Sequence, residues 1–216
     1  MQTDNVFRFA KYILLIIATA LFVSGCVSEG GKAKRPVDKE KSLNLHIQLA
    51  QGYIDKGNRE SARHHLRKAM EISSSSPEAN ETLARLYQLE GESKLAEETF
   101  KKAIKSKKNF TLAHNNFGVF LFGAKRYDEA LAQFELAAAD LDYNGRAAAL
   151  VNVGRTALLL GKNDRAKAAF EHAAVLDRNS ADAHIELAEI NFQQKEYAKA
   201  KEHLDRFQAT GQIGRA

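Results

Sequence analysis

Apolar and small residues recur at helical spacing from residue 43 almost to the end of the chain. A small residue opens each copy of the pattern, an alanine follows twelve residues later, and a leucine or phenylalanine stands four positions beyond that alanine. Apolar positions three or four residues apart predict amphipathic helices rather than strands. The 216 residues include only 2 prolines, so little interrupts such helices. We therefore predict an all-α fold.

The pattern occurs five times. The small residues are Ala50, Ala84, Gly118, Gly154 and Ala188. The alanines twelve positions later are Ala62, Ala96, Ala130, Ala166 and Ala200. The large residues are Leu66, Phe100, Phe134, Phe170 and Leu204. Successive copies are 34, 34, 36 and 34 residues apart, and the two extra residues fall in a loop at 140–147.

A 34-residue period with this pattern is typical of the tetratricopeptide repeat, which is a helix–turn–helix unit. Small residues let two antiparallel helices approach closely, and the large residue fills the space beside the contact. Stacked repeats then bury one continuous core. We predict a right-handed superhelix (an α-solenoid) of about five helix pairs, with repeats at 43–76, 77–110, 111–144, 147–180 and 181–214.

The segment after the fifth repeat, "QATGQIGRA", contains no further amphipathic helix. Repeat stacks usually close with a helix whose outer face is polar. We therefore expect an apolar end face around Leu204 and Phe207. Two explanations stay open: the chain is shortened relative to its relatives, or this face docks on another molecule.

The first 25 residues have the pattern of a secretory signal peptide. Arg8 and Lys11 precede an uncharged stretch at 12–23, and Ser24 and Gly25 follow it. This stretch is shorter than the ~20 apolar residues that a membrane-spanning helix needs. Residues 26–42 are rich in Gly, Lys, Asp and Glu and have no apolar period, so we predict a flexible tether.

Cys26 is the only cysteine in the chain, which excludes an internal disulfide. The sequence "VSGC" at 23–26 resembles the lipobox of bacterial lipoproteins. This resemblance implies cleavage before Cys26, followed by attachment of a diacylglyceryl group and a further acyl chain. Two or more acyl chains hold a protein stably in a membrane. Ser28 stands where inner-membrane lipoproteins commonly have an aspartate, so the resemblance implies an outer-membrane lipoprotein that faces the periplasm.

Little in the chain indicates chemistry. The net charge of +5 is spread out, and the basic segment "KKAIKSKK" at 101–108 reads as a solvated helix face, so we expect no nucleic-acid partner. Catalytic, phosphate-binding and metal-binding motifs are absent, and we predict no enzyme activity, no small-molecule substrate and no cofactor. His46, His114 and His184 occupy the same repeat position, which indicates packing rather than a site.

The first helix of each repeat is expected to line a concave groove. Groove positions lie three before, one after and four after the small residue. In repeats 3 to 5 these are Asn115, Val119, Phe122, Val151, Arg155, Leu158, Ile185, Glu189 and Phe192. Six of the nine are apolar, and an exposed apolar strip marks a partner site, here for an apolar or amphipathic segment. The alternative is that helix rotation buries these side chains in the core.

Three segments, at 92–104, 115–131 and 146–162, resemble the type IV pilus biogenesis and stability lipoproteins called PilW or PilF. The resemblance implies a pilotin, which helps secretin subunits to reach the outer membrane and assemble there. Members typically carry a sixth repeat, whereas five are visible here. Two other functions stay open: an adaptor that recruits cell-wall hydrolases, and a scaffold of the outer-membrane protein assembly machinery.

Overall fold

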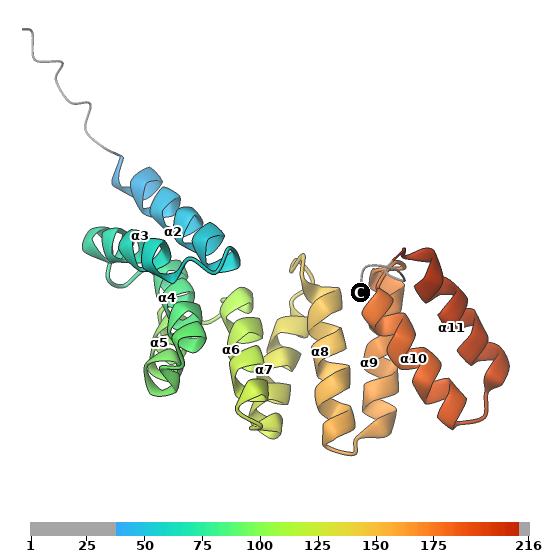
Figure 1. The fold of residues 1–216 in the computed structure, drawn as a ribbon. Coiled ribbons are helices and arrows are strands. Elements are labelled where there is room, and N and C mark those ends of the chain that lie inside the picture. Colours follow the sequence, from blue (N-terminus) through green and yellow to red (C-terminus); the bar gives the residue numbers. More distant parts are fainter. Residues whose placement is uncertain (1–37, 212–216) are drawn as a thin grey trace, which may run out of the picture. The chain divides into compact units, whose positions relative to one another are not determined.

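The computed structural model describes residues 38–211. The predicted signal peptide, Cys26 and most of the predicted tether lie outside this range. The described residues form ten α-helices and no strand (Figure 1). The helices are α2 (Lys39–Asp55), α3 (Arg59–Ile72), α4 (Pro77–Glu90), α5 (Ser93–Ser106), α6 (Thr111–Gly123), α7 (Tyr127–Ala139), α8 (Arg146–Leu159), α9 (Asn163–Leu176), α10 (Ala181–Gln193) and α11 (Tyr197–Ala209). None of these ten helices is long and apolar enough to cross a membrane.

The helices pack as five consecutive pairs, which confirms the predicted helix–turn–helix units. The first helix of each later pair also packs on the second helix of the preceding pair. One boundary differs from the sequence-based expectation, because α2 begins at Lys39, inside the segment predicted as tether. Lysine and glutamate are good helix formers, so the helix extends beyond the apolar pattern that marked its start. The right-handed superhelical path stays a prediction.

The turn inside each pair requires one residue with a left-handed backbone. These residues occupy the same repeat position and are Gly57, Gly91, Lys125, Gly161 and Lys195, with φ between 61° and 82°. Glycine adopts this conformation without steric cost. Helix starts are fixed by side chains as well: Ser76 accepts a hydrogen bond from the Ala79 amide ahead of Pro77, which is a favourable residue for a first helical turn.

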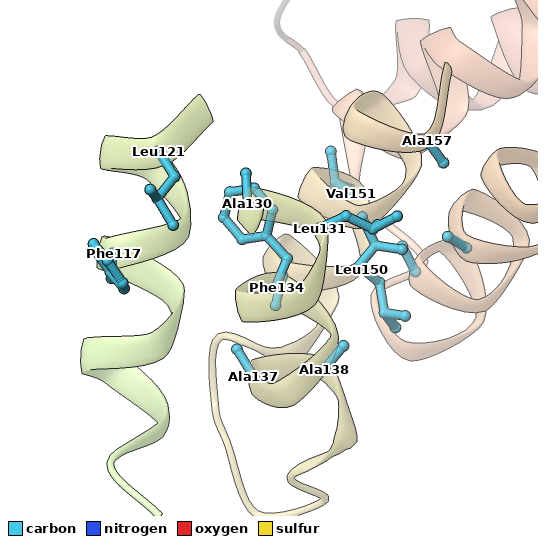
Figure 2. Packing of buried hydrophobic residues seen from close by; sticks show 14 of the residues in the cluster. Phe117, Leu121, Ala130, Leu131, Phe134, Ala137, Ala138, Leu150, Val151 and Ala157 are labelled. Carbon is cyan, nitrogen blue, oxygen red and sulfur yellow. The ribbon is translucent and has the colours of Figure 1, made fainter. Parts of the chain in front are cut away.

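The two helices of a pair approach most closely where the repeat has its small residue. A Cβ added at Gly118 would lie 2.6 Å from Phe134, and one added at Gly154 would lie 2.5 Å from Phe170. Both phenylalanines are at most 1% exposed. Figure 2 shows how the core continues across α7, with Phe117 and Leu121 of α6 on one side and side chains of α8 on the other. The close contact predicted from the small residues is therefore present.

Alanines also meet where neighbouring repeats join. The second helix of one repeat and the first helix of the next each contribute an alanine with no exposed surface. These alanines belong to the same buried clusters and are Ala69 with Ala79, Ala103 with Ala113, Ala137 with Ala149, and Ala173 with Ala183. Each of these four repeat junctions thus has a small, fully buried residue in both of its helices.

Ion pairs add a polar link between repeats. Arg126 contacts Glu97 of the preceding repeat at 2.7 Å, and this bond, with a contribution from Lys101, lowers the pKa of Glu97 to about 2. Partly exposed ion pairs contribute about 1 kcal/mol or less. Apolar packing therefore determines the fold, and the ion pairs supplement it.

Replacing Gly154 with alanine tests the close contact. The new methyl group would overlap Phe170, and we expect the free energy of unfolding to fall by about 1–3 kcal/mol, as for other overpacked cores. Urea unfolding followed by circular dichroism measures this change. Gly52→Ala is the matched control, because nothing lies within 4 Å of its added Cβ and alanine is favoured over glycine in a helix by up to ~1 kcal/mol. Equal midpoints for the two variants would contradict the contact.

Candidate protein-binding groove

Three of the predicted groove residues come together between repeats 3 and 4. Val119 and Phe122 of α6 and Arg155 of α8 line a pocket of about 140 Å³, together with Phe134 and Asn152. We call this the groove pocket. Val119 is 44% exposed, whereas Phe134, which closes the inner end, is 1% exposed. The volume suits a single apolar side chain, with polar groups of α8 at the rim.

An aromatic contact holds Phe122 in place. Its ring lies edge-on to Tyr127, with 5.4 Å between the ring centroids. Phe122 is half-buried and packs against the main core cluster, as does Leu158. Phe122 therefore contributes to both the groove pocket and the core, whereas Leu158 packs on the core and does not line the groove pocket.

Val151 does not line the groove. It is 3% exposed and belongs to the main core cluster. Val151 stands three positions before the small residue of repeat 4. The residues at the same position in repeats 2 and 3 are also covered: Glu81 has no exposed surface, and Asn115 is half-buried. This position therefore faces the neighbouring helices. The alternative interpretation, burial by helix rotation, is the correct one for Val151.

A series of polar contacts joins the first helices of successive repeats. In each case the residue two positions before the small residue bonds to a side chain of the preceding repeat. The four contacts are Gln51 Nε2 to Thr82 Oγ1 at 3.3 Å, Asn116 Nδ2 to Glu81 Oε1 at 2.6 Å, Asn152 Nδ2 to Asn115 Oδ1 at 3.4 Å, and Arg155 Nε to Glu186 Oε1 at 2.7 Å. We call this series the polar ladder.

Sequence reasoning missed the polar ladder, although a sign of it exists. The residue two before the small residue is polar in every copy: Gln48, Thr82, Asn116, Asn152 and Glu186. Five polar residues in one column of an otherwise apolar helix pattern indicate a shared role.

Glu81 anchors one end of this arrangement. Burial raises the pKa of its carboxyl group, although hydrogen bonds from Asn116 and Thr82 act in the opposite direction. The Asn116 amide donates to Glu81 and accepts from Asn115 Nδ2 at 3.2 Å, and Asn115 in turn accepts from Asn152. The three amides are thus oriented in series, and the last of them lines the groove pocket.

Ile185 and Phe192 lie on a second surface. Together with Glu186, Ala188, Glu189, Ala200 and Leu204 they line a hollow of about 510 Å³ on α10 and α11. We call this the tail face. Arg155 separates the two surfaces, because its guanidinium bonds to Asp182 and Glu186 of repeat 5. The predicted continuous apolar strip is therefore two separate surfaces.

The histidines pack in pairs within repeats. His46 and His65, and likewise His184 and His203, lie with their Nδ1 atoms 3.1 Å apart. In repeat 3 His114 contacts Gln133 at the equivalent place, at 2.8 Å. His184 Nε2 also donates to the Arg178 carbonyl at 3.0 Å. Within residues 38–211, no group of three or more His, Cys, Asp or Glu side chains is arranged to hold a metal ion.

Comparison with known sequences defines the class of protein. Models of the tetratricopeptide repeat match residues 43–76, 81–149 and 157–212. The chain is a tetratricopeptide-repeat protein, and stacked repeats of this kind form extended surfaces that bind other proteins.

The relatives are more specific. The chain is 36% identical over 205 residues to the type IV pilus assembly protein PilF of Pseudomonas aeruginosa, covering 94% of this chain and 81% of PilF. A solved structure of Pseudomonas aeruginosa PilF superposes with a TM-score of 0.77, covering 80% of this chain and 78% of that one. A crystal structure of PilW, which is 24% identical, shows the same fold with a TM-score of 0.70 over 79% of this chain and 78% of PilW. This chain belongs to the PilF/PilW family.

The histidine pairs predict a pH-dependent stability. Burial, and then the neighbouring His184, lower the pKa of His203 despite opposing contributions from Glu202 and Glu171. The unfolded chain, with an ordinary histidine pKa of about 6.5, therefore binds more protons than the folded chain. The free energy of unfolding should fall as the pH drops below about 6.5.

His203→Gln tests this effect, because glutamine already fills the equivalent place in repeat 3 as Gln133. The variant should keep the hydrogen bond to His184 and lose part of the decrease in stability between pH 7.5 and pH 5.5, measured by urea unfolding. The remaining decrease is assigned to His65, whose pKa is also lowered. An unchanged decrease in the variant would show that His203 does not contribute.

Proposed function

We propose that this protein is an outer-membrane lipoprotein pilotin that promotes the localisation and oligomerisation of secretin subunits for type IV pilus biogenesis. The observation that carries the proposal is the 36% identity over 94% of the chain to a protein named for type IV pilus assembly. The absence of catalytic motifs in the sequence agrees with a binding function.

Acylation of Cys26 provides the anchor in this proposal. The folded unit begins at Lys39, so about 12 residues separate it from Cys26, and these reach at most ~40 Å when fully extended. The first helix then begins within this distance of the inner leaflet of the outer membrane. A secretin subunit captured by the repeats is thereby held beside the membrane in which it assembles.

The groove pocket defines what the repeats recognise. Its walls, formed by Val119, Phe122 and Phe134, accept one apolar side chain, and its rim carries the Asn152 amide and the Arg155 guanidinium. A short apolar segment of secretin that places a side chain in this pocket can bond its backbone to the rim. Apolar burial supplies the affinity, and the oriented amide supplies direction.

Deletion of the gene tests the pilotin function. We expect ring-sized secretin multimers to disappear from the outer-membrane fraction, as seen by gel electrophoresis and immunoblotting, and to return when the wild-type gene is restored. Cys26→Ala should accumulate in the soluble periplasmic fraction and fail to restore the multimers. Wild-type levels of secretin multimers after deletion would disprove the function.

Val119→Asp tests the groove pocket separately. A carboxylate at this half-exposed position removes apolar surface from the pocket, and we expect secretin capture in a pull-down assay to fall at least ~10-fold, which corresponds to about 1.4 kcal/mol. Leu95→Asp is the matched control, since Leu95 is 42% exposed on α5, outside the pocket. Circular dichroism should be unchanged for both variants, and equal capture by the two would exclude the pocket.

A further inference from the structure

The outward side of α5, the second helix of repeat 2 (Figure 1), differs in charge from the second helices of the other repeats. Its central outward positions hold Lys94, Glu98, Lys101 and Lys105, and all four are exposed. The same positions hold two acidic residues in each of the other second helices: Glu60 and Glu71 of α3, where Arg67 lies between them, Asp128 and Glu135 of α7, Asp164 and Glu171 of α9, and Glu202 and Asp205 of α11. The repeat fold therefore accepts acidic residues at these positions, and the lysines of α5 are not needed for folding.

One lysine of α5 belongs to a balanced network of charges. Lys101 bonds to Glu97 at 2.6 Å, Glu97 bonds to Arg126 at 2.7 Å, and Arg126 bonds to Glu129 of α7 at 2.7 Å. The other two acidic residues of α7 are paired as well, Asp128 with Lys162 and Glu135 with Arg165. The carboxylates of α7 are therefore neutralised by cations other than the remaining lysines of α5.

Three lysines of α5 keep their positive charge. Lys102 donates to the neutral Ser74 carbonyl at 3.1 Å. Within residues 38–211, Lys94 and Lys105 form no ion pair, and Glu98 is the one carboxylate on the same side of the helix outside the balanced network. We call Lys94, Lys101, Lys102 and Lys105 the basic face. It extends over eleven residues of helix, which is about 16 Å.

The basic face and the groove pocket lie on different sides of α6. A hollow of about 440 Å³ beside the basic face is lined by Lys105 and by Phe117 and Leu121 of α6, among others. Val119 and Phe122, which line the groove pocket, are on the opposite side of α6, as the helical period requires. A surface that binds the basic face therefore leaves the groove pocket uncovered.

The residue type favours a lipid surface over a protein partner. Residues 94–108 contain six lysines and no arginine. Lysine is a compact charge on a flexible stem, whereas arginine is the side chain that matches fixed carboxylates in two-bond geometry. Headgroups of a bilayer are mobile and numerous, so they suit lysines. Lysines near an anionic membrane surface each contribute to its binding, and such a patch supplements a lipid anchor.

We propose that the basic face binds the anionic phospholipid headgroups of the membrane that carries the protein. Repeat 2 then lies on the bilayer surface through α5, and the groove pocket stays accessible to its ligand. This inference rests on the lipid anchor of the proposed function, to which it adds the orientation of the repeats.

Vesicle cosedimentation tests the proposal. The purified mature chain carries Cys26→Ala, so that no acyl chain contributes to binding. The vesicles consist of phosphatidylcholine alone or with about one third of anionic phosphatidylglycerol. We expect the protein to sediment with the anionic vesicles and not with the neutral ones, and to be released as the salt concentration rises, because salt screens exposed charges.

A triple variant locates the binding surface. Lys94→Gln, Lys102→Gln and Lys105→Gln together should weaken binding to the anionic vesicles at least ~10-fold, since each lysine near such a surface accounts for about a fivefold change. The matched control replaces three other exposed lysines that form no ion pair within residues 38–211 with glutamine, and these are Lys56, Lys125 and Lys195 in the turns of repeats 1, 3 and 5. The control loses the same charge and should bind nearly as well as the parent.

A fluorescent label reports which helix contacts the vesicles. The Cys26→Ala chain has no cysteine, so Glu98→Cys provides a single attachment site on the basic face. Glu202→Cys provides a site at the same repeat position of α11. The emission of an environment-sensitive dye should shift towards the blue at position 98 when anionic vesicles are added and stay unchanged at position 202.

Three results would overturn the proposal. One is equal binding to neutral and anionic vesicles, or no binding to either, by a protein with a normal circular dichroism spectrum. Another is an equal loss of binding in the two triple variants, or an equal shift at the two labels. The third is saturable binding of a glutamate-rich peptide without binding to anionic vesicles, which would make an acidic protein the partner. Vesicle binding involves no secretin, so each of these results leaves the secretin multimer experiment unaffected.

Discussion

The structure depends on the close approach of two helices inside each repeat, which is possible only where one side chain is small and the facing one is large. At Gly154 and Phe170 the gap is too narrow for even a methyl group. Gly118 and Phe134 make an equally close contact, and alanine takes the small position in the other three copies. The small residue thus sets the rotation of each helix in its pair. Positions counted from the small residue then face the same way in every repeat, so both the alanine contacts and the polar ladder follow from it.

The number of helix pairs could be predicted from the sequence because the determining residues occupy fixed places in a 34-residue period. The groove could be predicted only in part. Val119, Phe122 and Arg155 lie together, as predicted, but Val151 is in the core. Its burial could not be predicted because the sequence pattern does not reveal how closely α8 packs against α7. The start of α2 at Lys39 could not be predicted from apolar positions, because no apolar residue lies there. The high helix propensity of lysine and glutamate, and not burial, extends α2 to Lys39.

The polar ladder explains how an apolar fold can carry a directional surface. A core of alanine and phenylalanine holds the helices together through contacts that have no direction of their own. Hydrogen bonds have defined donors and acceptors, so Asn116 on Glu81 and Asn152 on Asn115 fix the register of neighbouring first helices. The same bonds orient the amide at the rim of the groove pocket, which connects the stability of the stack to its binding surface.

The two ends of the stack depart from the repeat pattern in the same way. Each of the four repeat junctions brings two alanines together, whereas α2 carries Leu45 and α11 carries Phe207 at the corresponding positions. If both ends had kept alanine, the head of one molecule would match the tail of another, and such a heterologous contact extends into open filaments. Leu45 and Phe207 are both larger than the alanines of the internal junctions, so they cannot reproduce that alanine contact.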